Sequence, residues 1–148
     1  MIAVVERVYS AAVSVDGQET GRIGAGLLVL LGVEKGDGQA DLDYIVRKVS
    51  GLRIFERGGK MTDSVLDTGG AILVVSQFTL SGDVRKGRRP DFTAAADPDT
   101  ARRMYEQCIA AFAAMGITTE SGVFGADMTV DRSGNGPVTI LLDSHKRF

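Results

Sequence analysis

The sequence contains few of the residue types on which most hydrolases and metal sites depend. Among its 148 residues are one cysteine, one histidine and no tryptophan. A single thiol, Cys108, cannot form an internal disulfide, which excludes a disulfide-stapled secreted scaffold and favours a reducing compartment. Because Cys108 and His145 supply the only thiolate and imidazole, a structural zinc site is nearly excluded too. We therefore expect neither a metal nor a cofactor.

Long apolar runs and a strong excess of one charge are also missing. The longest apolar run covers residues 26–33, far short of the ~20 residues that a membrane-spanning helix needs. The first residues show no signal peptide, so we expect a cytoplasmic protein without a membrane partner. Seventeen basic and 19 acidic residues leave a net charge of −2. No overall field then attracts nucleic acid, so we expect no DNA partner, and any RNA contact must be local.

The length fits one domain over residues 1–148. The 19 glycines are typical of turns and close backbone approaches in a β-rich fold. Asp16-Gly17 predicts a tight type I′ hairpin turn. The apolar spacing predicts an opening strand pair over residues 2–15 with a bend at 10–12, strands at 27–33, 52–56 and 71–80, and a final hairpin of residues 123–130 and 138–142.

Helical spacing occurs twice, over residues 39–52 and 98–115. Asp37 or Asp41 can cap the first helix, and Asp97 precedes a proline at the start of the second. Because hairpins predominate, we expect an α/β (α+β) domain whose sheet is mostly antiparallel, curled like a barrel and flanked by two main helices.

Familiar catalytic groups are scarce. His145 lies four positions from the end, where surface residues are usual, and Cys108 follows the apolar stripe of a helix, where a thiol is typical of the core. A Ser-His-Asp or Cys-His enzyme is therefore disfavoured. No glycine-rich nucleotide-binding motif follows a strand and opens a helix.

Two polar segments remain. Residues 76–80, Ser-Gln-Phe-Thr-Leu, end a buried strand, and residues 135–139, Asn-Gly-Pro-Val-Thr, enter the last strand. Each alone is typical of an ordinary strand end or turn. Together with residues 3–17 and the loop 86–90, they resemble the D-aminoacyl-tRNA deacylase family over nearly the whole chain. Two positions depart from that pattern: Asp91, where a small hydroxyl residue is expected, and Gly134, where asparagine is commoner.

The resemblance implies a homodimer that hydrolyses the ester between a D-amino acid, or glycine mischarged on tRNA(Ala), and the 3′-terminal adenosine of tRNA. It implies that Gly136-Pro137 is a cis peptide that enters the partner subunit's pocket and rejects L-aminoacyl-tRNA. Arg7 would hold this turn. The receiving pocket would be lined by four residues, Ser76, Gln77, Phe78 and Thr79.

An activated aminoacyl ester needs little help from side chains. Backbone N–H groups near Gln77, Phe78 and Thr79 can stabilise the oxyanion, and the 2′-hydroxyl of the substrate can assist the water. The competing hypothesis makes Thr79 the nucleophile, although no base is evident. The cations of the loop, Arg85, Lys86, Arg88 and Arg89, are either solvated or in contact with tRNA phosphates.

Two alternatives of other classes stay open at this point. The chain could be a dimeric RNA-binding module without catalysis, in which case the polar strand end is structural. It could also be a general esterase that uses Thr79 or Ser76.

Overall fold

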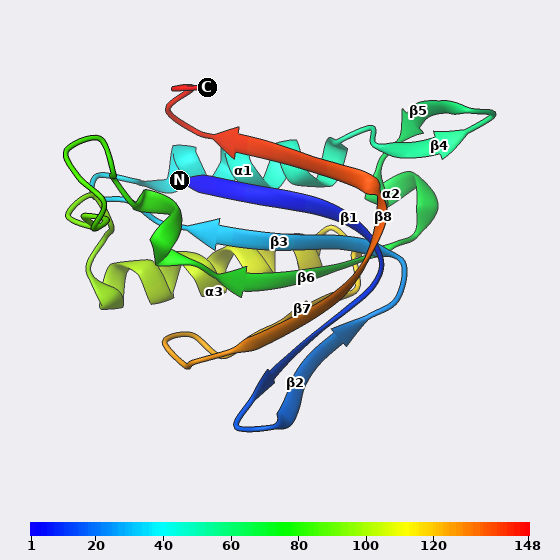
Figure 1. Cartoon of the computed structure of the whole chain (residues 1–148). Coiled ribbons are helices and arrows are strands. Elements are labelled where there is room, and N and C mark those ends of the chain that lie inside the picture. The colour runs from blue at the N-terminus through cyan, green and yellow to red at the C-terminus, as the bar shows by residue number, and fades with distance from the viewer.

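The computed structural model describes residues 1–148 and has one large curled sheet, with the long helices on one face, and a separate two-stranded sheet (Figure 1). The strand order is β2-β1-β3-β6-β7, and β8 pairs with β1. None of the helices is long and apolar enough to cross a membrane. The strands are β1 (Ile2–Val15), β2 (Gln18–Ile23), β3 (Gly26–Gly32), β4 (Phe55–Arg57), β5 (Lys60–Asp63), β6 (Ala71–Ser76), β7 (Thr119–Ser121) and β8 (Thr129–Asp143). The helices are α1 (Gln39–Gly51), α2 (Val65–Thr68) and α3 (Pro98–Ala114), with a 3-10 turn η1 (Phe78–Ser81).

The sheet is mostly antiparallel, as predicted. Strand β1 pairs antiparallel with β2, β3 and β8, whereas the β3–β6 and β6–β7 pairs are parallel. The turn between β1 and β2 has positive φ at Asp16 (50°) and Gly17 (77°), which fits the expected type I′ geometry. Strand β3 is buried almost throughout, as its uninterrupted apolar run predicts.

The sheet curls until its two ends approach each other. A Cβ atom added to Gly21 on β2 would lie only 2.7 Å from the carbonyl oxygen of Ser121 on β7. Glycine therefore permits the contact that brings these edge strands together. The barrel-like curl expected from the sequence is confirmed.

Helices α1 and α3 cover one face of the sheet and close the main core. Each buries an apolar stripe, for example Ile45 and Val49 on α1 and Cys108 and Phe112 on α3. As predicted, the Asp97 carboxylate caps α3 by accepting the N–H of Thr100 at 2.9 Å. The N-cap residue of α1 is Gly38, and the Asp41 carboxylate caps the helix start from position N3 by accepting the Gly38 N–H at 2.9 Å.

The predicted final hairpin is wrong. Strand β8 runs without a turn from Thr129 to Asp143 and follows β1 along most of its length. Glu6 pairs with Thr139 and Val8 pairs with Gly134, so residues 135–138 bulge out opposite Arg7. The long β1 strand provides a partner on both sides of the turn-forming residues, which therefore make a bulge rather than a reversal.

Two smaller predictions also need correction. The strand expected over residues 71–80 ends at Ser76 and continues into the 3-10 turn η1. The strand expected at 52–56 is the short β4, paired with an unpredicted β5. By contrast, β1 does bend near the expected residues 10–12, where its neighbour changes from β3, paired up to Val8, to β2, paired from Ala11 (Figure 1). Its register against β8 also shifts there, between Val8 and Ser10.

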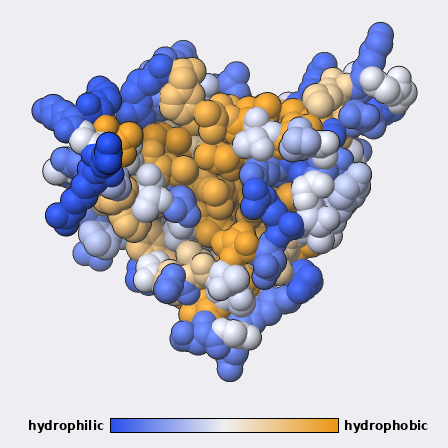
Figure 2. All heavy atoms as spheres, viewed as in Figure 1, coloured by the Kyte–Doolittle hydropathy of each residue, from blue (hydrophilic) through white to orange (hydrophobic).

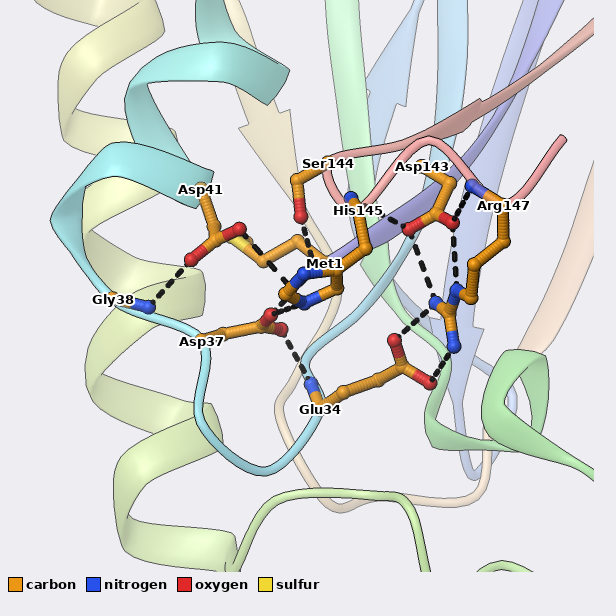
Figure 3. A network of polar contacts seen from close by, with 9 residues as sticks. All are labelled: Met1, Glu34, Asp37, Gly38, Asp41, Asp143, Ser144, His145 and Arg147. Atoms are coloured by element: carbon orange, nitrogen blue, oxygen red, sulfur yellow. Dashed lines mark hydrogen bonds and ion pairs between the residues drawn. The ribbon is translucent and has the colours of Figure 1, made fainter.

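The two ends of the chain meet beside the start of α1 (Figure 3). The Met1 ammonium donates to Asp37 Oδ1 at 2.7 Å and to Ser144 Oγ at 2.6 Å. His145, 44% exposed, also contacts Asp37 Oδ1, at 2.8 Å. His145 therefore has a surface structural role, as the sequence predicts.

A second part of this network anchors the end of β8. Arg147 donates to Asp143 at 2.7 Å and also contacts the buried Glu34. These hydrogen bonds from the Arg147 guanidinium hold the pKa of the Asp143 carboxyl well below its usual range.

Candidate functional site

A cleft of about 600 Å³ opens where β6 ends, between α3 and the segment that leads into β8. Most of its lining is apolar or aromatic, which suits a ligand that has flat apolar surfaces. The lining residues are Leu31, Val33, Val75, Ser76, Gln77, Phe78, Ala95, Ala96, Pro98, Ala101, Tyr105, Phe124, Gly125, Ala126, Asp127, Met128 and Val130.

The structure brings three of the four predicted pocket residues to this cleft. Ser76 ends β6, and Gln77 and Phe78 follow where the chain turns into η1. Thr79 is exposed next to the cleft without lining it, and its hydroxyl is hydrogen-bonded to the Gln77 side chain. The Thr79 side chain is thus already engaged and lies outside the lining.

Backbone N–H groups at this turn differ in availability. The N–H of Gln77 donates to the Leu31 carbonyl at 2.8 Å, so it is not free to bind an oxyanion. Phe78 and Thr79 open a 3-10 turn, and the first N–H groups of such a turn have no acceptor within it. Of the three N–H groups considered from the sequence, two therefore remain available.

Aromatic rings border the cleft. Phe78 is 60% exposed and meets the ring of Phe92 edge-on, with centroids 5.2 Å apart. Phe124 packs against Tyr105, and the guanidinium of Arg102 lies 5.1 Å from its ring centroid. Burial raises the pKa of Tyr105 to about 12, so this phenol stays protonated and donates to the Val74 carbonyl at 2.9 Å.

Gly136 and Pro137 lie in the exposed bulge of β8 and do not line the cleft of their own chain. The peptide bond between them is cis. Buried Arg7 donates from Nε to the Asn135 carbonyl at 3.0 Å and from Nη1 to the Ile54 carbonyl at 2.5 Å. Arg7 thus contacts the bulge, in the place that the resemblance implied.

The loop that carries the basic residues is closed at its base by two backbone hydrogen bonds between Asp83 and Asp91. Arg85 is paired with Asp83 at 2.6 Å, so it contributes little free charge. The other three cations of the loop are exposed and form no ion pair. The loop also reaches the cleft, because Phe92 contacts Phe78.

The two departures from the family pattern have simple structural settings. The Asp91 carboxylate accepts the N–H of Thr93 at 2.6 Å and so closes a local turn. A Cβ atom added to Gly134 would meet nothing within 4 Å. Neither residue lines the cleft.

Residues 124–128 form one side of the cleft, and the sequence did not indicate that they would line a site. These residues were expected in a strand, but they form a loop in which Gly125 has a φ of 79°. A glycine inside an apparent strand pattern was the available signal. Phe124 and Met128 are the large side chains that this loop contributes to the cleft.

Other candidate reactive groups lie outside the cleft. Cys108 is fully buried on α3, and burial raises the pKa of its thiol to about 12, so it is a core residue, as predicted. Ligand-type atoms of Asp37, Asp41 and His145 lie within 4.8 Å of one another. The Met1 ammonium donates to Asp37, one of these three residues, at 2.7 Å.

The chain is similar to known proteins over almost its whole length. Residues 4–143 match the family model described as D-Tyr-tRNA(Tyr) deacylase. The chain is 55% identical to a protein named D-aminoacyl-tRNA deacylase from Desulfitobacterium hafniense (strain DSM 10664 / DCB-2), over 100% of both chains.

Two solved structures are similar as well. One is described as c-Myc DNA Unwinding Element Binding Protein, with a TM-score of 0.90 and 41% identity, covering 97% of this chain and 98% of that one. The other, described as a probable eukaryotic D-amino acid tRNA deacylase, has a TM-score of 0.80 at 18% identity, covers 95% and 97%, and shows the fold alone. From the family match and the full-length relatives, we conclude that the chain belongs to the D-Tyr-tRNA(Tyr) deacylase family.

Proposed function

We propose that this protein hydrolyses the ester bond of D-aminoacyl-tRNA and releases the free D-amino acid and tRNA. The observation that carries this proposal is the turn after β6, which presents two N–H groups without a partner in the turn beside an apolar cleft. An aminoacyl-adenosine end has a flat base and an ester carbonyl, and the cleft and the turn offer matching surfaces to each. Family membership identifies the reaction to which this geometry would be applied.

The backbone would stabilise the charge that develops on the ester. The N–H groups of Phe78 and Thr79 would donate to the oxyanion, and one such donor typically contributes roughly 2.7–4 kcal/mol. No imidazole or thiol lines the cleft, and its single carboxylate, Asp127, makes no hydrogen bond to Thr79. The 2′-hydroxyl of the terminal ribose would therefore assist the attacking water, and Thr79 would not be the nucleophile.

A second copy of the chain would complete the site. On the sheet face away from the helices, Val4 pairs with Leu30 on β3 and with Leu141 on β8. Leu141 is 57% exposed, and Figure 2 shows a continuous apolar area across this face. An exposed apolar patch of this kind is typical of a subunit interface. Dimerisation through it would bring the exposed bulge of one subunit to the partner.

The bulge would then select the chirality of the substrate. With the ammonium group held by the backbone carbonyls of Gly136 and Pro137 from the partner, an L side chain would collide with this wall. A D side chain would point away from it. Glycine has no side chain to reject, so glycyl-tRNA, including glycine mischarged on tRNA(Ala), would also be hydrolysed.

The direct test is to incubate the purified protein with D-tyrosyl-, L-tyrosyl- and glycyl-tRNA. We expect hydrolysis of the D and glycyl substrates and negligible hydrolysis of the L substrate. A non-catalytic nucleic-acid-binding protein, the alternative favoured by the description of one similar structure, would hydrolyse none of them. A general esterase would also cleave simple esters, and either result would contradict the proposal.

The basic loop would contact phosphates of the tRNA. Replacing Lys86, Arg88 and Arg89 together with alanine should raise the KM for aminoacyl-tRNA and lessen its salt dependence, with little change in kcat. Arg85→Ala is the matched control, because its guanidinium is already bound to Asp83, and it should have a much smaller effect. Equal effects of Arg85 and the other three cations would contradict this assignment.

A further inference from the structure

The position of the β8 bulge depends on few contacts. Residues 135–138 have no partner in the register between β1 and β8, and Gly136 and Pro137 are exposed. One contact to the bulge is the hydrogen bond from Arg7 Nε to the Asn135 carbonyl. A displacement of these residues would move the wall on which the proposed chiral selection rests.

A second side-chain contact lies near the bulge, an ion pair between Arg132 on β8 and Glu6 on β1. Arg132 lies before the bulge, where it pairs with Ala11, whereas Glu6 pairs with Thr139 after the bulge. Arg132 Nε nevertheless approaches Glu6 Oε2 to 2.5 Å. This ion pair thus links β8 before the bulge to the β1 residue that pairs with β8 after the bulge.

The setting of this pair distinguishes it from the ordinary surface pairs of the chain. The Glu6 side chain is 17% exposed and that of Arg132 is 49% exposed, whereas Glu19 and Arg22 on β2 form an equally short pair at 45% and 61% exposure. Partial burial lessens screening by water and salt. Because neighbouring residues in a strand point to opposite faces, the Glu6 ion pair with Arg132 and the Arg7 hydrogen bond to Asn135 lie on opposite faces of β1.

We infer that the Glu6–Arg132 ion pair positions Gly136-Pro137 and thereby sets how strongly the enzyme discriminates D- from L-aminoacyl-tRNA. This inference rests on the proposed function. Neither residue lines the cleft, so both are positioning residues. Displacements of about 1 Å at a reacting centre can cost about 100-fold in rate. Loss of an ion pair that positions the bulge should therefore change the hydrolysis rate measurably.

The test is a double-mutant cycle with Glu6→Gln, Arg132→Gln and the double variant, and Arg22→Gln as the matched control. For each protein, kcat/KM is measured with D- and L-tyrosyl-tRNA, together with amide hydrogen exchange of Gly134 and Thr139, which pair with β1 at the two ends of the bulge. We expect each single variant to lower the D/L ratio about fivefold and to speed exchange about fivefold, near the upper limit for a single ion pair. The double variant should equal either single variant, and Arg22→Gln should match the wild type in both measurements.

Unchanged D/L ratios and exchange in the single variants, or additive losses in the double variant, would overturn the inference. Exchange reads the position of the bulge without any catalysis. If the wild type hydrolyses neither substrate, the proposed function fails, while faster exchange in Glu6→Gln and Arg132→Gln alone would still establish the positioning role. A loss of the D/L ratio without faster exchange would contradict positioning and indicate contact with the substrate.

Discussion

A D-aminoacyl-tRNA that ends in 2′-deoxyadenosine should be hydrolysed roughly 10²–10⁴-fold more slowly than the normal substrate, which is the usual contribution of general acid–base assistance. The reason is that no imidazole or thiol in the cleft can replace the missing hydroxyl. Binding should change little, because the base, the amino acid and the phosphates are intact. Single-turnover hydrolysis at saturating enzyme separates the chemical step from binding.

Thr79→Ala is the paired variant. Loss of one neutral hydrogen bond, here that between Thr79 and Gln77, costs about 0.5–1.5 kcal/mol, so substantial activity should remain. If Thr79 were the nucleophile, the variant would lose activity by many orders of magnitude. An inactive but folded Thr79→Ala protein, together with normal hydrolysis of the deoxy substrate, would reverse the mechanism.

Gly136→Ala should lower kcat/KM for D-aminoacyl-tRNA by at least about 100-fold, since small displacements at a reacting centre have effects of that size. Gly136 has a φ of 141°, and a Cβ atom there would lie 2.6 Å from the Val138 nitrogen. The alanine variant must therefore move the bulge that carries Pro137. Steady-state kinetics with D- and L-tyrosyl-tRNA measure the loss and any change in discrimination.

Gly134→Ala is a control only two positions away. Its added Cβ would meet nothing within 4 Å, so we expect kinetics close to those of the wild type. Far-UV circular dichroism and thermal unfolding should show both variants folded. If Gly136→Ala had the kinetics of the wild type, the bulge would have no role in the reaction, which would contradict the proposal.

Local signals in the sequence predicted much of the fold because they are physically short-ranged. Asp16-Gly17, the Asp97 cap and the apolar stripes of α1 and α3 each depend on a few neighbouring residues, and the structure confirms them. The final hairpin failed for the opposite reason. Whether Asn135-Gly136-Pro137 reverses the chain depends on the long partner strand β1, which extends on both sides of it.

In the candidate site, too, features set by neighbouring residues were predictable and features set by distant strands were not. The segment 76–79 was evident as polar residues after a buried strand, and three of its residues line the cleft. That Leu31 engages the Gln77 N–H could not be predicted, because it depends on the parallel pairing of β3 and β6. Likewise, the pairing of Arg85 with Asp83 separates one cation of the basic loop from the others in a way that charge counting does not show.

If the bulge of one subunit completes the cleft of the other, as we propose, mixing of two differently impaired subunits should restore activity. Gly136→Ala leaves the cleft intact, whereas Ala101→Trp would fill the cleft, which Ala101 lines from α3, and leave the bulge intact. Each variant alone should be inactive. After unfolding and refolding together, with heterodimers verified by native mass spectrometry, a symmetric dimer predicts recovery of about one quarter of the wild-type activity, because half of the dimers carry one intact composite site. Heterodimers without activity would contradict the claim.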